Sequence, residues 1–174
     1  MEQRQKPVVS AGFTYSPLEE MLDIPQKNTR LHIGIPKETS FQESRIALTP
    51  DAVTILTHNG HNIVVEHGAG HGSHFSDTDY SEAGAEILQD KASVFKADII
   101  VKSAPLNDEE ISLLRPHQIV ISPIHLAALQ AEQMQRMMDK RITLLSFENL
   151  KDDHGTYPIV RAMSEIAEIG RAHV

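Results

Sequence analysis

The feature that most limits how this chain can fold is a regular alternation of short apolar runs with segments of helical spacing, from residue 31 onward. The apolar runs are rich in β-branched residues and nearly continuous, as in strands that are buried on both faces. Such strands, alternating with helices, predict an α/β fold: an open, mostly parallel sheet with helices on both faces. The expected strands cover 31–35, 62–66, 98–102, 118–124 and 142–148.

Helices are expected between these strands, and local signals mark where several of them begin. Thr49 and Pro50 open one helix, which ends before Gly60. Asn107 caps another helix, with Glu110 in the capping-box position. Two further helices are expected, a short one within 78–90 and a longer one over 127–140.

Residues 1–30 differ from the rest of the chain, because three prolines interrupt them and few apolar residues recur at a regular spacing. We interpret this segment as an N-terminal arm, in which Ser16 could cap one short helix. It is either disordered or packed on a partner subunit. The regular domain is expected over 31–160.

The charge balance restricts the partners that the chain can have. Sixteen Lys and Arg face 24 Asp and Glu, a net charge of -8. Nucleic acids and anionic membrane surfaces require clustered positive charge, so neither is an expected partner. The sequence has no cysteine and shows neither a membrane span nor a secretory signal, which favours a cytoplasmic protein.

Polar side chains follow the expected strands at the points where these strands end. In open parallel sheets, ligands bind at the carboxyl ends of the strands. A histidine at such a point can transfer a proton near neutral pH, and a lysine can polarise a carbonyl group. The side chains in this position are Lys37, Glu38, His67, Lys102, Ser103, His125 and Glu148.

The loop 68–73 contains three glycines after a strand, yet it lacks the features of a dinucleotide-binding turn. Ser73 stands where that fingerprint needs its last glycine, and turn-like residues follow instead of a helix. His67, His71 and His74 lie close together here, but a glycine-rich loop without thiols is a poor frame for a metal. We therefore expect neither a dinucleotide nor a metal at this loop.

Several motifs, in order and at the right spacing, resemble the N-terminal domain of the alanine dehydrogenase and pyridine nucleotide transhydrogenase family. The resemblance covers residues 31–167. Its motifs are Gly34-Ile-Pro-Lys-Glu38, Glu43-x-Arg45-Ile-Ala-Leu-Thr-Pro50, Asn59-Gly-His61, Gly68-Ala-Gly-x-Gly-Ser73, Asp79-Tyr-x-x-Ala-Gly-Ala85 and Pro158-Ile-Val-x-x-Met-Ser-Glu-Ile-Ala167.

The resemblance implies NAD-dependent, reversible oxidative deamination of L-alanine to pyruvate and ammonia. Arg45 would bind the substrate carboxylate, Lys102 would support the carbonyl side, and His125 would be the catalytic acid–base. Ser164 would contact the nicotinamide nucleotide. The element His125-Leu-Ala-Ala128 favours a dehydrogenase, because transhydrogenases lack this histidine.

One position departs from the pattern of alanine dehydrogenases. They have a second lysine after the fourth strand that contacts the substrate, and an ungapped alignment places Ala104 there. The following residues are closer to those of transhydrogenases. A transhydrogenase alpha-type subunit, a dehydrogenase for another amino acid, and a non-catalytic module that binds small carboxylates therefore remain alternatives.

The resemblance also implies a second, NAD-binding domain, whose glycine-rich fingerprint does not appear in these 174 residues. Residues 161–167 match the start of an interdomain helix, and we interpret residues 168–174 as an artefactual tail that matches translated sequencing adapter. The chain alone is then expected to be inactive and to aggregate through exposed apolar surface. The full-length enzyme is expected to be a homo-oligomer.

Overall fold

The computed structural model describes residues 30–40, 42–124 and 129–171, and it confirms the predicted α/β class. Six strands form one sheet, in which every pairing is parallel and the order is β3-β2-β1-β4-β5-β6. The strands are β1 His32–Ile35, β2 Asn62–Glu66, β3 Glu86–Leu88, β4 Ile99–Val101, β5 Ile119–Ile121 and β6 Thr143–Leu145.

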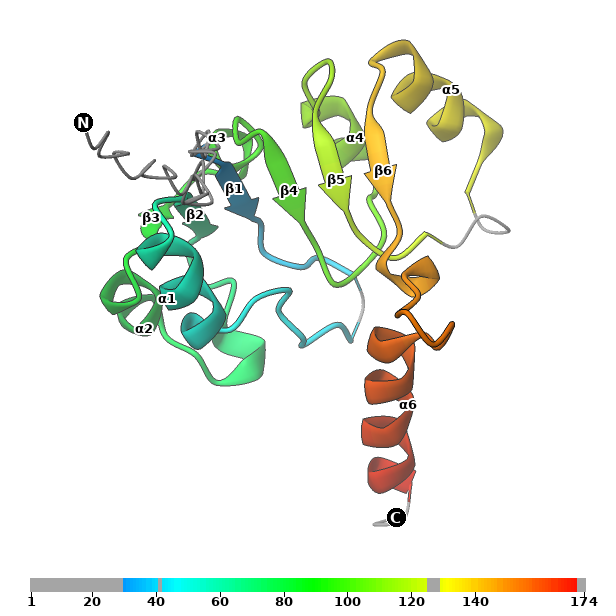
Figure 1. Cartoon of the computed structure of the whole chain (residues 1–174). Helices are drawn as coiled ribbons and strands as arrows, with labels where there is room; N and C mark the ends of the chain where they lie inside the picture. Colours follow the sequence, from blue (N-terminus) through cyan, green and yellow to red (C-terminus); the bar gives the residue numbers. More distant parts are fainter. Residues whose placement is uncertain (1–29, 41, 125–128, 172–174) are drawn as a thin grey trace, which may run out of the picture.

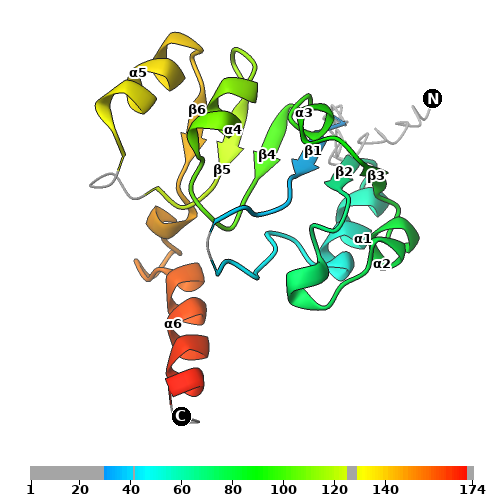
Figure 2. The ribbon, with the colours of Figure 1, turned by 180° about the vertical axis from the view of Figure 1, so that it is seen from behind.

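Helices cover both faces of the sheet, as the two opposite views in Figures 1 and 2 show. The helices α1 and α2 lie on one face beside β1, β2 and β3, and α3 and α4 lie on the other face, with α5 next to α4. Their bounds are α1 Pro50–His58, α2 Asp77–Glu82, α3 Lys91–Val94, α4 Asp108–Leu113 and α5 Ala131–Asp139.

Each face of the sheet has its own apolar core, because successive side chains of a strand point to opposite faces. Ile33 and Ile35 of β1 pack with Val53 of α1 and Tyr80 of α2. On the other face, Ile100 of β4 belongs to a cluster with Val94, Ile111, Val120 and Met137. Because β1 and β4 are parallel neighbours between the two cores, their carboxyl ends lie side by side at one edge of the sheet.

Two elements between β2 and β4 differ from the prediction of a single short helix within 78–90. The structure has α2, then the edge strand β3, then α3, whose N-cap Asp90 accepts hydrogen bonds from two backbone amides. β3 has only three residues and no apolar run, so its sequence carries little strand signal. The predicted strands 118–124 and 142–148 are shorter, ending where the chain turns into loops.

The last helix, α6 Pro158–Arg171, extends away from the carboxyl ends of the strands (Figure 1). It follows the 3-10 turn η2 Phe147–Asn149, which it contacts. No helix in the described parts of the chain is long and apolar enough to cross a membrane. Except for Arg30, the predicted arm lies outside the described residues, as do 125–128 and the end of the predicted tail from 172 onward.

Candidate functional site

The strand order places the site where β1 and β4 lie side by side. From β1 the chain adds β2 and then β3 toward one edge of the sheet. It then returns to the other side of β1, where β4, β5 and β6 extend the sheet toward the opposite edge. This reversal is the point where doubly wound sheets bind ligands, outside the carboxyl ends of the strands. Glu38 follows β1 here, and its Oε1 accepts a hydrogen bond of 2.5 Å from the backbone amide of Ser103, which follows β4.

Lys102 lies at this point with its ammonium group inside the protein. Its Nζ is 3.0 Å from Oε2 of Glu38 and 2.7 Å from Oε1 of Glu110, and its side chain is 1% exposed. Glu110 is fully buried and also lies 3.6 Å from Nζ of Lys91. Two carboxylates therefore hold the Lys102 ammonium, and its predicted contact with a substrate stays a prediction.

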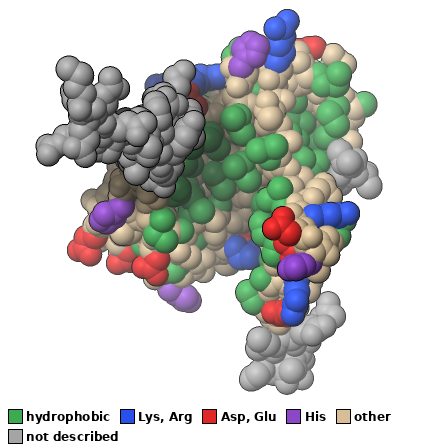
Figure 3. All heavy atoms as spheres, in the orientation of Figure 1, with side chains coloured by type: hydrophobic (Ala, Val, Ile, Leu, Met, Phe, Trp, Pro, Cys, Tyr) green, Lys and Arg blue, Asp and Glu red, His purple; other side chains and the backbone are tan. Residues whose placement is uncertain are grey.

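An apolar cavity of about 680 Å³ lies on the α1 side of the sheet, over β1, β4 and β5. Figure 3 shows hydrophobic side chains in the hollow at the centre of this face. Side chains from the sheet, from the loop before α1, and from η2 and α6 share the wall. They include Leu31, Ile33, Ile46, Leu48, Ile99, Val101, Ile121, Phe147, Leu150, Ile159 and Met163, with Arg45, Thr49, Lys102 and Ser103 among the polar lining residues.

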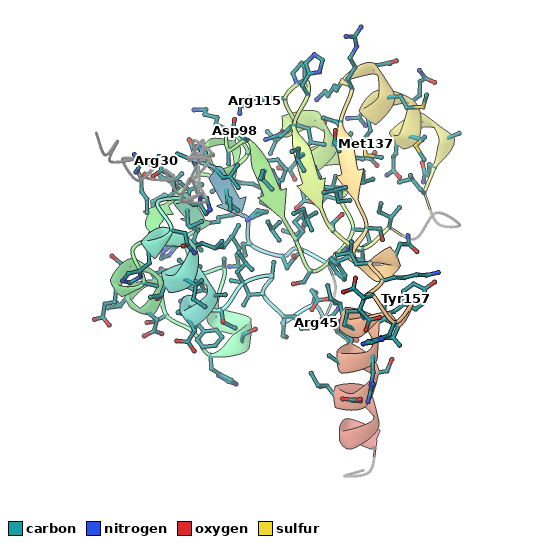
Figure 4. The ribbon with its side chains drawn as sticks, viewed as in Figure 1. Arg30, Arg45, Asp98, Arg115, Met137 and Tyr157 are labelled. Carbon is teal, nitrogen blue, oxygen red and sulfur yellow. The ribbon has the colours of Figure 1, made fainter. Side chains whose placement is uncertain are left out.

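Arg45 is the polar side chain of this lining that best fits an anion. It lies in the loop before α1, close to the start of α6 (Figure 4). Its Nε and Nη2 donate to the two carboxylate oxygens of Glu43 at 2.8 and 2.5 Å, and the side chain is 55% exposed. The hydrogen bonds that Arg45 donates to the Glu43 carboxylate raise the pKa of Arg45, so the guanidinium stays charged.

Of the other two predicted site residues, Ser164 lies within the described part of the chain and His125 does not. Ser164 lies on the exposed surface of α6, where its hydroxyl donates to the carbonyl of Val160 at 2.9 Å. It is next to Met163, which lines the cavity, but its predicted cofactor contact is untested. His125, the predicted acid–base, lies outside the described residues. The structure therefore places Arg45 and Lys102 in the lining of one cavity, and the roles of all four residues stay predictions.

The glycine-rich loop 68–73 packs against its own domain. A Cβ atom on Gly70 would lie 2.7 Å from the Tyr80 ring, and one on Gly72 would lie 2.8 Å from the Ser44 carbonyl oxygen. The space that a dinucleotide would need beside these glycines is thus filled by protein. Nδ1 of His67 lies 2.6 Å from Oδ2 of Asp77. Across the described ranges, no group of three His, Cys, Asp or Glu could hold a metal.

Local sequence patterns do not reveal that Glu43 pairs with Arg45 or that Glu38 and Glu110 pair with Lys102. Glu43 was part of a motif and Glu110 was read only as a capping-box residue, a role that it does have through its bond from the Asn107 amide. The signal for Glu43 is its position two residues before Arg45. The Glu38–Lys102 contact requires knowing that β1 and β4 are neighbours, which local patterns do not reveal.

Comparison with protein families gives a match over residues 34–167 to the family described as "Alanine dehydrogenase/PNT, N-terminal domain". Two curated relatives are alanine dehydrogenases. The one from Bacillus subtilis (strain 168) is 39% identical over 135 residues, 78% of this chain and 35% of the relative. The one from Staphylococcus saprophyticus is 35% identical over 136 residues, 78% of this chain and 36% of the relative. The chain thus spans about a third of the length of these relatives.

Solved structures give the same result for the fold. A structure of L-alanine dehydrogenase superposes with a TM-score of 0.72 at 31% identity, covering 76% of this chain and 36% of that one. The transhydrogenase from Sinorhizobium meliloti superposes with a TM-score of 0.62 at 32% identity, covering 67% of this chain and 34% of that one.

Proposed function

Since the chain belongs to the family of alanine dehydrogenase and pyridine nucleotide transhydrogenase (PNT) N-terminal domains, we propose that it is the substrate-binding part of an NAD-dependent L-alanine dehydrogenase. The reaction is the reversible oxidative deamination of L-alanine to pyruvate and ammonia. The observation that carries this proposal is Arg45, a permanent cation at the edge of an apolar cavity beside the ligand-binding point of the sheet.

The chemistry of the substrate fits this arrangement. A guanidinium can hold a carboxylate through two parallel hydrogen bonds, which fixes the orientation of a small 2-amino or 2-oxo acid. The apolar wall takes the methyl group. Two carboxylates surround the ammonium group of Lys102, so we propose that Lys102 holds the loop after β4 in place. Its ammonium group would contact the substrate carbonyl only after a movement of that loop.

His125 would move protons between the carbinolamine and the attacking water, a task that suits a side chain titrating near neutral pH. A bound NAD would supply the acceptor for the hydride that leaves the alanine Cα. The filled spaces beside Gly70 and Gly72 do not fit a dinucleotide, so we assign its binding mainly to a second domain, with Ser164 as a contact. A cytoplasmic homo-oligomer is part of this proposal.

A transhydrogenase-type subunit is the second candidate, and Ala104 is the observation that favours it. Ala104 is buried at 3% exposure, and its amide lies 3.3 Å from Oε1 of Glu38, so no lysine reaches the cavity from this position. Over the matched parts, the sequence identity of this chain to the transhydrogenase structure is 32%, and its identity to the dehydrogenase structure is 31%. The element beginning at His125 supports the dehydrogenase.

A chimera distinguishes the two candidates. Residues 34–167 replace the matching segment of the Bacillus subtilis alanine dehydrogenase, and oxidation of NADH is measured with pyruvate and ammonia. We expect activity in the chimera, its loss in the Arg45→Met chimera, and none in the 174-residue chain alone. The transhydrogenase candidate would be supported by a folded chimera that binds NADH and does not oxidise it with pyruvate and ammonia. Such a chimera should instead transfer hydride from NADH to a second nicotinamide nucleotide.

A further inference from the structure

The guanidinium of Arg45 has two edges that can each hold a carboxylate, and Glu43 occupies one of them. Nε and Nη2 form the side edge, and both donate to Glu43, at 2.8 and 2.5 Å. Nη1 and Nη2 form the end edge. The side edge is thus filled by the protein itself, and the end edge is the one from which a further anion can be bound in parallel geometry.

Glu43 is itself fixed. Its side chain is 12% exposed, compared with 55% for Arg45, and its Oε1 also accepts the backbone amide of Arg45 at 2.9 Å. The hydrogen bond from the Arg45 side chain holds the pKa of Glu43 below its usual value, so the carboxylate stays charged. Glu43 therefore restricts a long side chain that would otherwise sample many rotamers.

The backbone between these two residues is anchored to the glycine-rich loop. The carbonyl of Ser44 accepts a hydrogen bond of 2.7 Å from the hydroxyl of Ser73, and Gly72 lies so close to Ser44 that a Cβ there would be 2.8 Å from the same carbonyl oxygen. Local sequence patterns assign this loop no role. Its close approach gives it one, because it fixes the peptide that carries Glu43 and Arg45.

The charges around the cavity leave Arg45 as its available cation. Among the described residues, Arg45 and Lys102 are the lysines and arginines in the cavity wall, and two carboxylates hold the Lys102 ammonium. We propose that Glu43 is a positioning residue: it holds the side edge of the Arg45 guanidinium so that the end edge binds the carboxylate of a small 2-oxo or 2-amino acid. This inference rests on the proposed function, and it identifies Glu43 as the residue that orients Arg45 for binding the substrate carboxylate.

The opposite role for Glu43 is that of a competitor that occupies Arg45 until the ligand displaces it. The two roles predict changes of opposite sign. Removing the charge of a positioning residue weakens carboxylate binding, whereas removing a competitor strengthens it. In either role, removing the charge of Glu43 should not change the binding of an uncharged ligand of the same size. A general loss of structure would weaken the binding of both ligands, so comparing a charged and an uncharged ligand distinguishes it from both roles.

The test uses the 174-residue chain and measures the affinities for pyruvate and for its neutral amide by NMR titration. We expect Glu43→Gln to weaken pyruvate binding by about tenfold, the order expected for one charge-assisted contact, and to leave the amide unchanged. Glu82→Gln, an exposed carboxylate on α2, is the matched control and should change neither affinity. In the Arg45→Met background, Glu43→Gln should have no further effect.

Each of the following results would contradict either the positioning role of Glu43 or the proposed function. Equal or tighter pyruvate binding by Glu43→Gln overturns the positioning role, as does an equal loss for pyruvate and the amide. If the unaltered chain binds no pyruvate while the pKa of Glu43 remains lowered by Arg45, the pair exists and the proposed function fails. If that pKa is unchanged in Arg45→Met, the pair does not form and the positioning role fails by itself.

Discussion

At the scale of single residues, Tyr80 couples the stability of the domain to alkaline pH. Its ring is completely buried, and its hydroxyl donates to the carbonyl of Leu48 at 2.8 Å. Burial, and secondarily the charge of Asp79, raises the pKa of Tyr80 to about 12. The folded state thus favours the neutral phenol. This contribution is complete below the unfolded value of about 10 and is lost as the pH rises through the folded value.

We therefore expect the free energy of unfolding to fall between pH values of about 10 and 12, and Tyr80→Phe to flatten that fall. Urea unfolding at several alkaline pH values measures the slope, and tyrosinate absorbance follows the titration itself. Tyr157, which is 41% exposed, gives the control variant Tyr157→Phe. An unchanged slope in Tyr80→Phe would contradict the assignment.

At the scale of elements, the Lys102 ion pairs join the loop after β1, the end of β4 and the start of α4. Lys102→Met leaves the carboxylates of Glu38 and Glu110 buried without their cation, and loss of one partner from a buried pair costs about 3–5 kcal/mol. Denaturant titration should show this loss, against a near-zero effect for Lys96→Met on the exposed surface. Equal effects in the two variants would mean that the pairs are not formed.

β1 and α3 approach each other closely at Gly34. A Cβ atom there would lie 2.7 Å from the backbone oxygen of Val94 and 3.0 Å from Cβ of Ala97, and neither can rotate away. Gly34→Ala should therefore destabilise the fold by about 1–3 kcal/mol, the usual cost of overpacking. Thermal and urea unfolding check this value. A change within about 0.5 kcal/mol, as at surface sites, would contradict the close contact.

The strands and helices also show how much of the fold and of the candidate site can be predicted from the sequence. The strands 31–35 and 62–66 were placed within a residue, because their apolar runs are continuous and their bounds are marked by Pro36 and by Gly60. β3 and α3 were missed, since three- and four-residue elements are held by their neighbours rather than by a local pattern. The motif 43–50 singles out Arg45, which does line the cavity, and its role stays a prediction. The burial of Lys102 depends on strand order, which local patterns do not reveal.

At the scale of the whole molecule, the sheet is covered unequally. Among the described elements on the α1 side, the helices lie over β1, β2 and β3 (Figure 1). The apolar cavity lies over β1, β4 and β5 and is open to solvent (Figure 3). α6 adds Ile159 and Met163 to the same wall as it leaves the domain. Contiguous apolar surface of this kind is uncommon on monomers and favours association.

The 174-residue chain should therefore bind an environment-sensitive anilinonaphthalene dye in its folded state and self-associate as its concentration rises. Leu150 and Ile159 line the cavity at 50% and 38% exposure, and Leu150→Gln/Ile159→Gln should reduce both effects by lowering the apolar area that can be buried. Ile55 on α1 is 64% exposed and lies outside the cavity lining, so Ile55→Gln is the matched control. Dye fluorescence and sedimentation velocity measure the two effects. If Ile55→Gln lowered them as much as the double variant does, scattered surface residues rather than the cavity would drive association, and the cavity would not be a binding surface.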